Sequence, residues 1–103
     1  MKNFRTFNLS AEFYKSIKNL DLPTDAKNQL DRAARSISLN LAEGSGKATA
    51  KDQRRFFQIA FGSLRECQAV FMLEHLEETE QFKLLDKLGA HLYKLIKNSR
   101  CGI

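Results

Sequence analysis

The sequence predicts an all-α fold, an antiparallel up-down-up-down four-helix bundle. Four stretches repeat their apolar residues at spacings of three and four, and no stretch alternates apolar and polar residues long enough for a strand. Only one proline and five glycines occur among 103 residues, so few positions interrupt a helix. The connections between the four stretches are short, which favours antiparallel neighbours. We expect a single domain spanning residues 1–103.

The first predicted helix covers residues 7–20. Leu9, Phe13 and Ile17 recur on one face of it, as expected for a helix that lies against a core. The helix ends before Pro23, because proline lacks the backbone N–H that a continuing helix needs.

The second predicted helix covers residues 25–43. Thr24 or Asp25 is its candidate N-cap, since either side chain can accept a hydrogen bond from a first-turn N–H. Gly44 and Gly46 follow, and a glycine in the left-handed conformation commonly closes a helix. We expect these glycines to stop the helix and form a tight turn.

The third predicted helix is the longest, covering residues 50–78 with Thr49 as its N-cap. Two neighbouring apolar seams run along it, and they consist of Phe56, Phe57, Ile59, Ala60, Leu64, Cys67, Val70, Phe71 and Leu73. A helix with so wide an apolar surface is usually buried on more than one side. One small domain cannot cover all of it, so the pattern predicts contact between subunits.

The fourth predicted helix covers residues 80–98, with Thr79 as its cap and leucines at helical spacing. The intervening Glu-Glu-Thr-Glu-Gln could itself remain helical, so the boundary with the third helix stays open. Lys94, Lys97 and Arg100 complement the negative carboxyl end of the fourth helix dipole.

The chain is basic, and its excess positive charge lies in its first half. The net charge is +5; residues 1–55 hold 11 Lys and Arg against 6 Asp and Glu, and residues 56–103 hold 6 of each. A basic surface favours anionic partners such as nucleic acid. The alternative is that the charge serves only solubility.

Membrane insertion and secretion have no support in the sequence. No apolar run approaches the roughly 18 residues of a membrane span, and the first residues lack the apolar core of a signal peptide. We expect a cytoplasmic protein with no membrane partner. Cys67 and Cys101 are expected to be free thiols.

The stretch Gly44–Lys47 looks like the end of a phosphate-binding loop. That loop requires G-x-x-x-x-G-K-[ST] between a strand and a helix. Here Leu41 stands at the first glycine position, Ala48 stands at the hydroxyl position, and the preceding residues have helical periodicity. We therefore predict an inter-helix turn and no nucleotide hydrolysis.

A basic cluster follows this turn: Lys47, Lys51, Arg54 and Arg55. It lies at the amino end of the third helix, where free N–H groups and the helix dipole favour anions. We predict that these side chains contact the phosphate backbone of a nucleic acid.

No arrangement of residues predicts catalysis, a metal site or a cofactor. His75 and His91 are the only histidines, and neither has the Glu-x-x-His spacing of di-metal bundles. Cys67 lies in an apolar seam with no nearby base in the sequence. We therefore expect a protein that is not an enzyme and has no cofactor.

Polar residues interrupt two of the helix faces. Arg32, Ser36 and Asn40 follow one another at steps of four, and Ser63 and Glu66 lie on the second seam of the third helix. A buried Glu66 would need a partner, for which Arg32 is the candidate. The alternative is that both side chains reach solvent at the edge of the bundle.

Two blocks of the chain, residues 29–47 and 56–66, resemble the four-helix bundle proteins of the 23S rRNA intervening-sequence family. That family typically reads Q-L-x-R-A-x-x-S-I-P-x-N-I-A-E-G, followed by F-x-x-I-A-x-G-S-L-x-E. The matching residues are Gln29, Leu30, Arg32, Ala33, Ser36, Ile37, Asn40, Ala42, Glu43, Gly44, Phe56, Ile59, Ala60, Gly62, Ser63, Leu64 and Glu66. Ser38 stands where proline is usual, and Leu41 where isoleucine is usual.

The resemblance implies a ring-shaped homo-oligomer, a homopentamer, with no enzymatic activity. Asn40, Glu43 and Gly44 would then be structural residues that fix the end of the second helix. The chain is also similar to accessory proteins of retroelements, whose partners are nucleic acid and a reverse transcriptase. Two functions follow: an oligomeric accessory protein that binds structured RNA or DNA, or an oligomeric protein-interaction scaffold with no direct nucleic-acid role.

Overall fold

The computed structural model describes the backbone of residues 4–101 and the side chains of residues 4–99, and this part of the chain is helical without a strand. Its elements are α1 (Phe4–Ser16), the short 3-10 helix η1 (Ile17–Asn19), α2 (Thr24–Ser45), α3 (Ala50–Leu73) and α4 (Glu80–Cys101). The predicted all-α fold with four long helices is confirmed.

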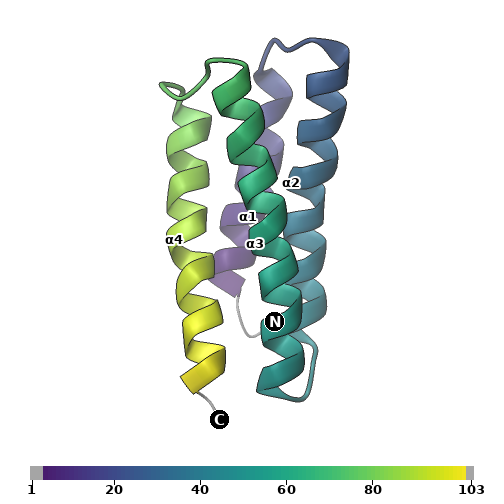
Figure 1. Cartoon of the computed structure of the whole chain (residues 1–103), viewed down its shortest axis with the longest axis vertical. Coiled ribbons are helices and arrows are strands. Elements are labelled where there is room, and N and C mark those ends of the chain that lie inside the picture. Colours follow the sequence, from purple (N-terminus) through teal and green to yellow (C-terminus); the bar gives the residue numbers. More distant parts are fainter. Residues whose placement is uncertain (1–3, 102–103) are drawn as a thin grey trace.

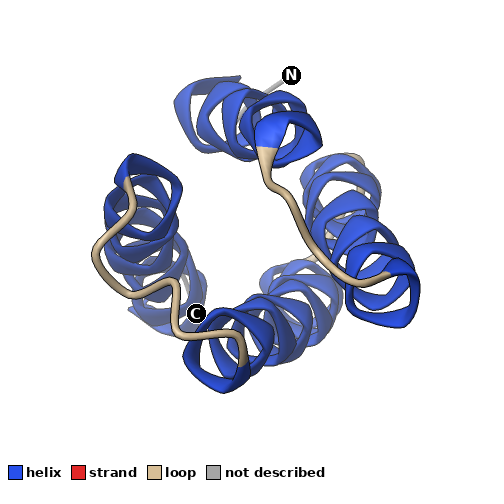
Figure 2. Cartoon of the chain, turned by 90° about the horizontal axis from the view of Figure 1, so that it is seen from above, coloured by secondary structure: helices blue, strands red, loops and turns tan. Residues whose placement is uncertain are grey.

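The four helices lie side by side in an elongated molecule of 43 × 20 × 19 Å (Figure 1). Seen along the long axis they stand around a common centre, and each contacts the helices before and after it, with α4 also against α1 (Figure 2). Contacts of α1 and η1 with α2 run in opposite order along the chain, since Ser10 of α1 meets Ser38 whereas Lys18 of η1 meets Asp31. None of the described helices is long and apolar enough to cross a membrane.

One apolar core fills the space between the helices. The core residues are Leu9, Phe13, Ile17, Leu30, Ala33, Ala34, Ile37, Leu41, Phe57, Ala60, Leu64, Cys67, Val70, Phe71, Leu85, Leu88 and Leu92. These are largely the residues whose spacing predicted the helix faces. The rings of Phe13 and Phe71 approach each other at a centroid distance of 6.0 Å, which joins α1 to α3 in the centre.

The third helix ends at Leu73, so its predicted continuation to residue 78 is wrong. His75 has a φ of 58° and takes the left-handed position that often follows a helix. The Leu76 N–H then donates to the Phe71 carbonyl at 2.8 Å, and Leu76 packs against the core. A histidine performs this role, so no glycine marked the end of the helix in the sequence.

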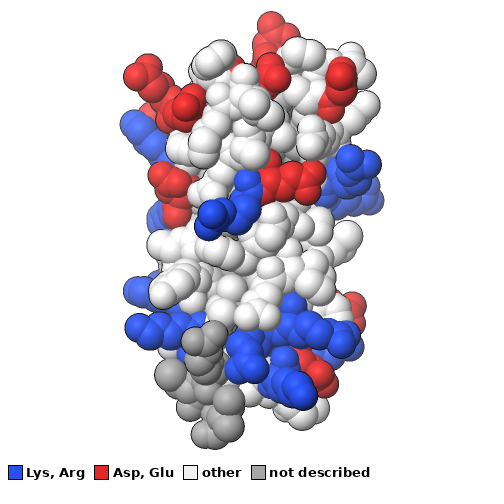
Figure 3. Space-filling model, in the orientation of Figure 1, with Lys and Arg blue, Asp and Glu red and all other residues white. Residues whose placement is uncertain are grey.

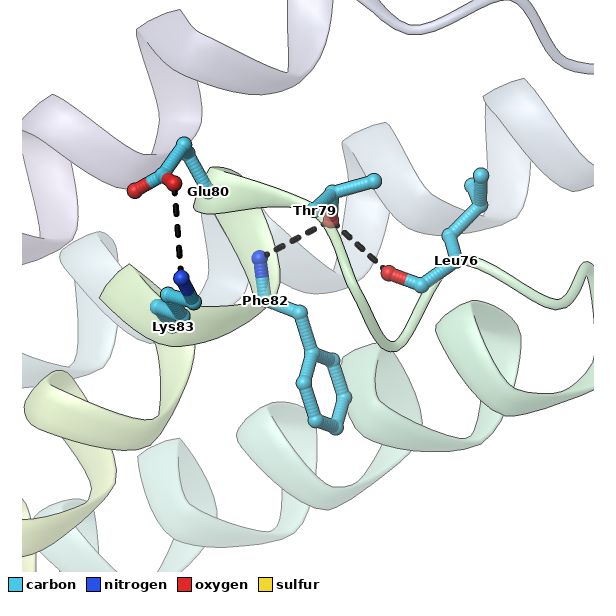
Figure 4. Close-up of polar contacts among 5 residues, drawn as sticks. All are labelled: Leu76, Thr79, Glu80, Phe82 and Lys83. Atoms are coloured by element: carbon cyan, nitrogen blue, oxygen red, sulfur yellow. Dashed lines mark hydrogen bonds and ion pairs between the residues drawn. The ribbon is translucent and has the colours of Figure 1, made fainter.

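Threonine caps begin α3 and α4, as predicted. The Thr49 hydroxyl accepts a hydrogen bond from the Asp52 N–H at 3.2 Å. The Thr79 hydroxyl accepts one from the Phe82 N–H at 3.2 Å and donates to the Leu76 carbonyl at 2.8 Å (Figure 4). The second contact also holds the α3–α4 connection against the start of α4.

The predicted cap of α2 is wrong. Thr24 is already the first helical residue, and Pro23 takes the N-cap position without a side-chain hydrogen bond. The Pro23 carbonyl accepts from the Lys27 N–H at 2.9 Å, which closes the first turn. A fixed proline φ of −55° suits this position and leaves no capping role for Thr24 or Asp25.

Gly44 does not stop α2, which continues through it to Ser45. Gly46 is the C-cap with a φ of −88°, and no described glycine has a positive φ, so the predicted left-handed stop is wrong. Gly44 instead allows close packing: a Cβ added there would lie 2.7 Å from Cε1 of Phe57 and 3.0 Å from Cβ of Phe56. Glycine is required where α3 approaches the end of α2.

The outer boundaries of α1 and α4 also differ from the predictions. α1 begins at Phe4 instead of residue 7 and changes to the 3-10 form at Ile17. α4 begins at residue 80 as predicted and extends to Cys101 instead of residue 98. Helix ends are the positions at which local sequence signals are weakest.

Candidate nucleic-acid interface

The predicted basic cluster lies on the first turns of α3, directly after the α2–α3 turn. Because the Thr49 cap starts the helix, Lys51, Arg54 and Arg55 stand at i, i+3 and i+4 and share one side of α3. Lys51 and Arg55 are exposed, and Arg54 is half-buried. The structure therefore brings these three predicted residues together on one accessible surface.

Lys47 and Arg55 meet at the ring of Phe56. The Lys47 Nζ atom lies 5.1 Å from the ring centroid and the Arg55 guanidinium carbon lies 5.3 Å from it. Such cation–π contacts stabilise the orientation of both side chains. Lys47 also pairs with Glu43, at 3.1 Å between Nζ and Oε2, so its positive charge is partly offset. We define Lys47, Lys51, Arg54 and Arg55 as the α2–α3 cluster.

The amino end of α3 already has a negative group. The Asp52 N–H is occupied by the Thr49 hydroxyl, and the Asp52 carboxylate lies in the first helical turn. A carboxylate there satisfies the positive end of the helix dipole. Basic side chains, and not the free N–H groups of the helix, are therefore the groups available to a phosphate.

The fold adds basic residues to this part of the molecule that the sequence did not single out. The start of α1, the α2–α3 turn and the end of α4 lie in the same half of the bundle (Figure 1), which we call the basic half. Its described basic residues are Arg5, Lys47, Lys51, Arg54, Arg55, Lys94 and Lys97, against the acidic residues Glu43 and Asp52.

The opposite half holds the α1–α2 and α3–α4 connections and has the reverse balance. Residues 12–31 and 74–83, which form these connections and the adjoining parts of the helices, hold the acidic residues Glu12, Asp21, Asp25, Asp31, Glu74, Glu77, Glu78 and Glu80 against the basic residues Lys15, Lys18, Lys27 and Lys83. On the face shown in Figure 3, red side chains gather toward this half and blue ones dominate the other. Lys94 and Lys97 belong to the basic half because α4 ends there, and the sequence pattern indicated for them only a favourable contact with the helix dipole.

The possible buried pair of Arg32 and Glu66 is not formed. Both side chains are exposed, and no ion pair joins them in the described part of the chain. The polar link between α2 and α3 is made instead by Ser63, whose hydroxyl donates to the Ser36 hydroxyl at 2.8 Å. Charged groups keep their hydration at the bundle edge, while small neutral hydroxyls meet inside it.

Two further polar residues of α2, Asn40 and Ser38, make side-chain hydrogen bonds. The Asn40 side-chain amide donates to the Ser36 carbonyl at 2.9 Å and to the Ser36 hydroxyl at 3.1 Å, which holds the Ser36 acceptor in place. Ser38 contacts Ser10 of α1 at 2.8 Å. Since the Ser10 hydroxyl donates to the Phe7 carbonyl, Ser38 is the donor in this pair. A proline at position 38 has no hydroxyl for this contact.

The buried thiol of Cys67 is held in its neutral form. Burial, with a smaller effect of Glu66, raises the pKa of the thiol to about 12. A thiol rather than a thiolate is a poor nucleophile and packs as a small apolar group. Among the described residues no three His, Cys, Asp or Glu side chains come close enough to hold a metal ion.

One comparison with known proteins finds a match. No curated protein and no solved structure matches the chain. The family model described as 23S rRNA-intervening sequence protein matches residues 4–98, which include all four helices except the last residues of α4. The chain therefore belongs to the 23S rRNA-intervening sequence protein family.

Proposed function

We propose that the chain is a non-enzymatic, oligomeric accessory protein that binds structured RNA through the basic half of its bundle. The observation that supports this most strongly is the separation of charge: the basic half holds seven described basic residues and only two acidic ones. A surface of this kind attracts the phosphate backbone of a nucleic acid without reading its sequence. The similarity to retroelement accessory proteins makes a reverse transcriptase a further proposed partner.

The proposed subunit is an antiparallel up-down-up-down bundle that assembles as a ring-shaped homopentamer. The opposite order of contacts along α1 and α2 supports the antiparallel arrangement. Exposed apolar side chains on α3 support assembly: Ile59 is 47% exposed, Met72 is 50% exposed and Leu73 is 76% exposed. Such residues are commonly covered by another subunit. The ring and its number of subunits rest on the family resemblance.

A salt titration of RNA binding tests the function. Each phosphate that a cation neutralises contributes about 0.7–0.9 to the slope of log K against log salt concentration. We expect the triple variant Lys51→Ala, Arg54→Ala and Arg55→Ala to weaken binding of a labelled structured RNA at near-physiological salt. The magnitude of the slope should fall by about 2–3.

A matched control removes three positive charges from the rest of the molecule, through Lys27→Ala, Arg35→Ala and Lys83→Ala. Both triple variants have the same net charge, so only the position of the lost charges differs. Unchanged affinity and slope in the Lys51, Arg54 and Arg55 variant, or an equal loss in both variants, would contradict RNA binding through the α2–α3 cluster.

The exposed apolar residues of α3 favour a second function, an oligomeric scaffold that binds proteins. Light scattering of the purified protein and RNA binding together separate the two functions. An oligomer that fails to bind structured RNA at near-physiological salt would support the scaffold. A monomer at micromolar concentration would exclude the oligomer that both functions assume.

A further inference from the structure

A second group of positive charges lies where α1 packs against α4. Arg5 is on the first turn of α1, and Lys87 and Lys94 flank the half-buried His91 on α4. Burial, followed by the positive charges of Arg5, Lys87 and Lys94, lowers the pKa of His91.

α1 packs against α4, and the Gln81 side-chain amide of α4 donates to the Ser16 carbonyl at the end of α1 at 3.3 Å. The start of α1 therefore lies beside the second half of α4, so that cations from two helices surround one imidazole.

No ion pair is formed by Arg5, Lys87 or Lys94 with any carboxylate in the described part of the chain. Neighbouring like charges without a counter-charge raise the local positive potential, so they favour binding of an anion.

The α1–α4 contact has a different charge balance in the opposite half of the molecule. There a shallow cavity of about 410 Å³ is lined by Glu12 and Glu80 as well as Lys83 and Lys87. The two carboxylates there offset the two lysines, so along the α1–α4 contact the excess positive charge lies around Arg5, His91 and Lys94. The positive charge along the α1–α4 contact thus increases toward the basic half, as it does in the whole molecule.

We propose that Arg5, His91 and Lys94, which we call the α1–α4 cluster, form a second phosphate-contact surface. Double-stranded RNA bound to the basic half would then contact this surface in addition to the α2–α3 cluster on the other side of the bundle. The inference rests on the proposed RNA-binding function and extends it to the other two helices.

The position of the two clusters indicates the size of the partner. In the ring of helices the α1–α4 contact is opposite the α2–α3 contact (Figure 2), and the bundle is 20 × 19 Å in cross-section. A duplex has a phosphate charge for every 1.7 Å or so of its axis, so about 12 phosphates occupy such a width. Because the two clusters lie on opposite sides of the bundle, only an extended RNA that crosses the end of the bundle, or two separate segments of RNA, can contact both, and one nucleotide cannot.

The two histidines give a direct test, because they lie in opposite halves of the bundle. His75 is in the α3–α4 connection and His91 is in the α1–α4 cluster. The imidazole signals of both are followed by NMR against pH, with and without a short RNA duplex. We expect RNA to raise the pKa of His91, because bound phosphates offset the three cations, and to leave the imidazole signals of His75 unchanged at each pH.

Three outcomes of the titration would overturn the inference. The pKa of His91 could stay constant although RNA binds, or both histidines could respond equally. Inorganic phosphate at matched ionic strength could also shift His91 as much as RNA does, which would mean that any small anion suffices.

A variant pair separates this inference from the proposed function. Arg5→Ala with Lys94→Ala removes two exposed cations from the α1–α4 cluster, and Lys27→Ala with Lys83→Ala removes two from the opposite half. We expect the first pair to lower the magnitude of the salt slope by about 1–2, and the second to leave it unchanged. Circular dichroism confirms that both variants remain helical.

The possible failures can be told apart. If the unmodified protein does not bind duplex RNA, the proposed function fails and the α1–α4 cluster fails with it. If RNA binding depends on the α2–α3 cluster but the Arg5 and Lys94 variant behaves like its control, only the further inference is wrong.

Discussion

Gly44 shows how a single residue determines the approach of two helices. It is buried in α2, and the position of its missing Cβ is only 2.7 Å from the ring of the buried Phe57. Gly44→Ala therefore forces Phe57 or the helix to move, and overpacking of this kind costs about 1–3 kcal/mol. The higher helix propensity of alanine offsets at most about 1 kcal/mol of this.

Urea denaturation at fixed protein concentration measures the effect. We expect a lower free energy of unfolding for Gly44→Ala. The control is Gly46→Ala in the same turn, where a Cβ finds only ordinary contacts and φ is negative. The control should be neutral or stabilise by up to about 1 kcal/mol. Equal effects of the two substitutions would show that the α2–α3 approach is not tight.

His75 follows a helix end that the neighbouring residues did not predict. A left-handed residue is needed after α3, and a histidine occupies this position without the glycine that usually marks it. The burial of Leu76 against the core favours this reversal of the chain. Such a contact between a connection and the core cannot be identified from the residues near the helix end alone.

At the scale of the elements, the contribution of an N-cap to stability can be measured by a single substitution. Thr79→Ala removes the hydroxyl that bonds both the Phe82 N–H and the Leu76 carbonyl. Loss of an N-cap costs about 1 kcal/mol and up to about 2 kcal/mol. Thermal unfolding should show a melting temperature that is lower by about 4–8 °C per kcal/mol for a domain of this size.

Thr24→Ala is the matched control for this prediction. Thr24 is exposed at the start of α2 and makes no capping hydrogen bond. Its replacement should change the free energy of unfolding by no more than about 0.5 kcal/mol. A loss at Thr24 as large as that at Thr79 would refute the assignment of Pro23 as the N-cap of α2.

At the scale of the whole molecule, the apolar surface that α3 leaves uncovered predicts self-association. Ile59→Glu places a charge at an exposed apolar position of α3, and burying that charge between subunits is unfavourable. Light scattering should show a mass that falls toward the 11.8 kDa of one chain. Ala90→Glu on the exposed side of α4 introduces the same charge and should leave the mass unchanged. Assembly that survives Ile59→Glu would move the interface away from this part of α3.

Most of the fold could be predicted because the core follows helical periodicity. Residues such as Phe13, Leu41 and Leu88 recur at the spacing of a helix face, and all three are buried. Thr49 and Thr79 were recognisable as caps because a capping hydrogen bond spans only three residues. Local contacts of this kind depend only on residues that are close together in the sequence.

The candidate site could be predicted only in part, because some of its residues come together only when distant segments pack. Lys51, Arg54 and Arg55 share a surface because they are neighbours on one helix, so their spacing was sufficient to find them. The second half of the chain has no net charge, and it therefore gave no basic signal. Its charges are separated along α4 and its preceding connection, from Glu77, Glu78 and Glu80 at one end of the bundle toward Lys94 and Lys97 at the other.

Periodicity and short-range hydrogen bonding thus established the number of helices, their inward faces, two of their caps and the α2–α3 cluster. The packing of distant segments decided the rest: the need for glycine at position 44, the exposure of Arg32 and Glu66, and the joining of Arg5 and Lys94 to the basic half. Helical spacing relates residues three or four positions apart, whereas these features depend on side chains that meet only after the helices have packed.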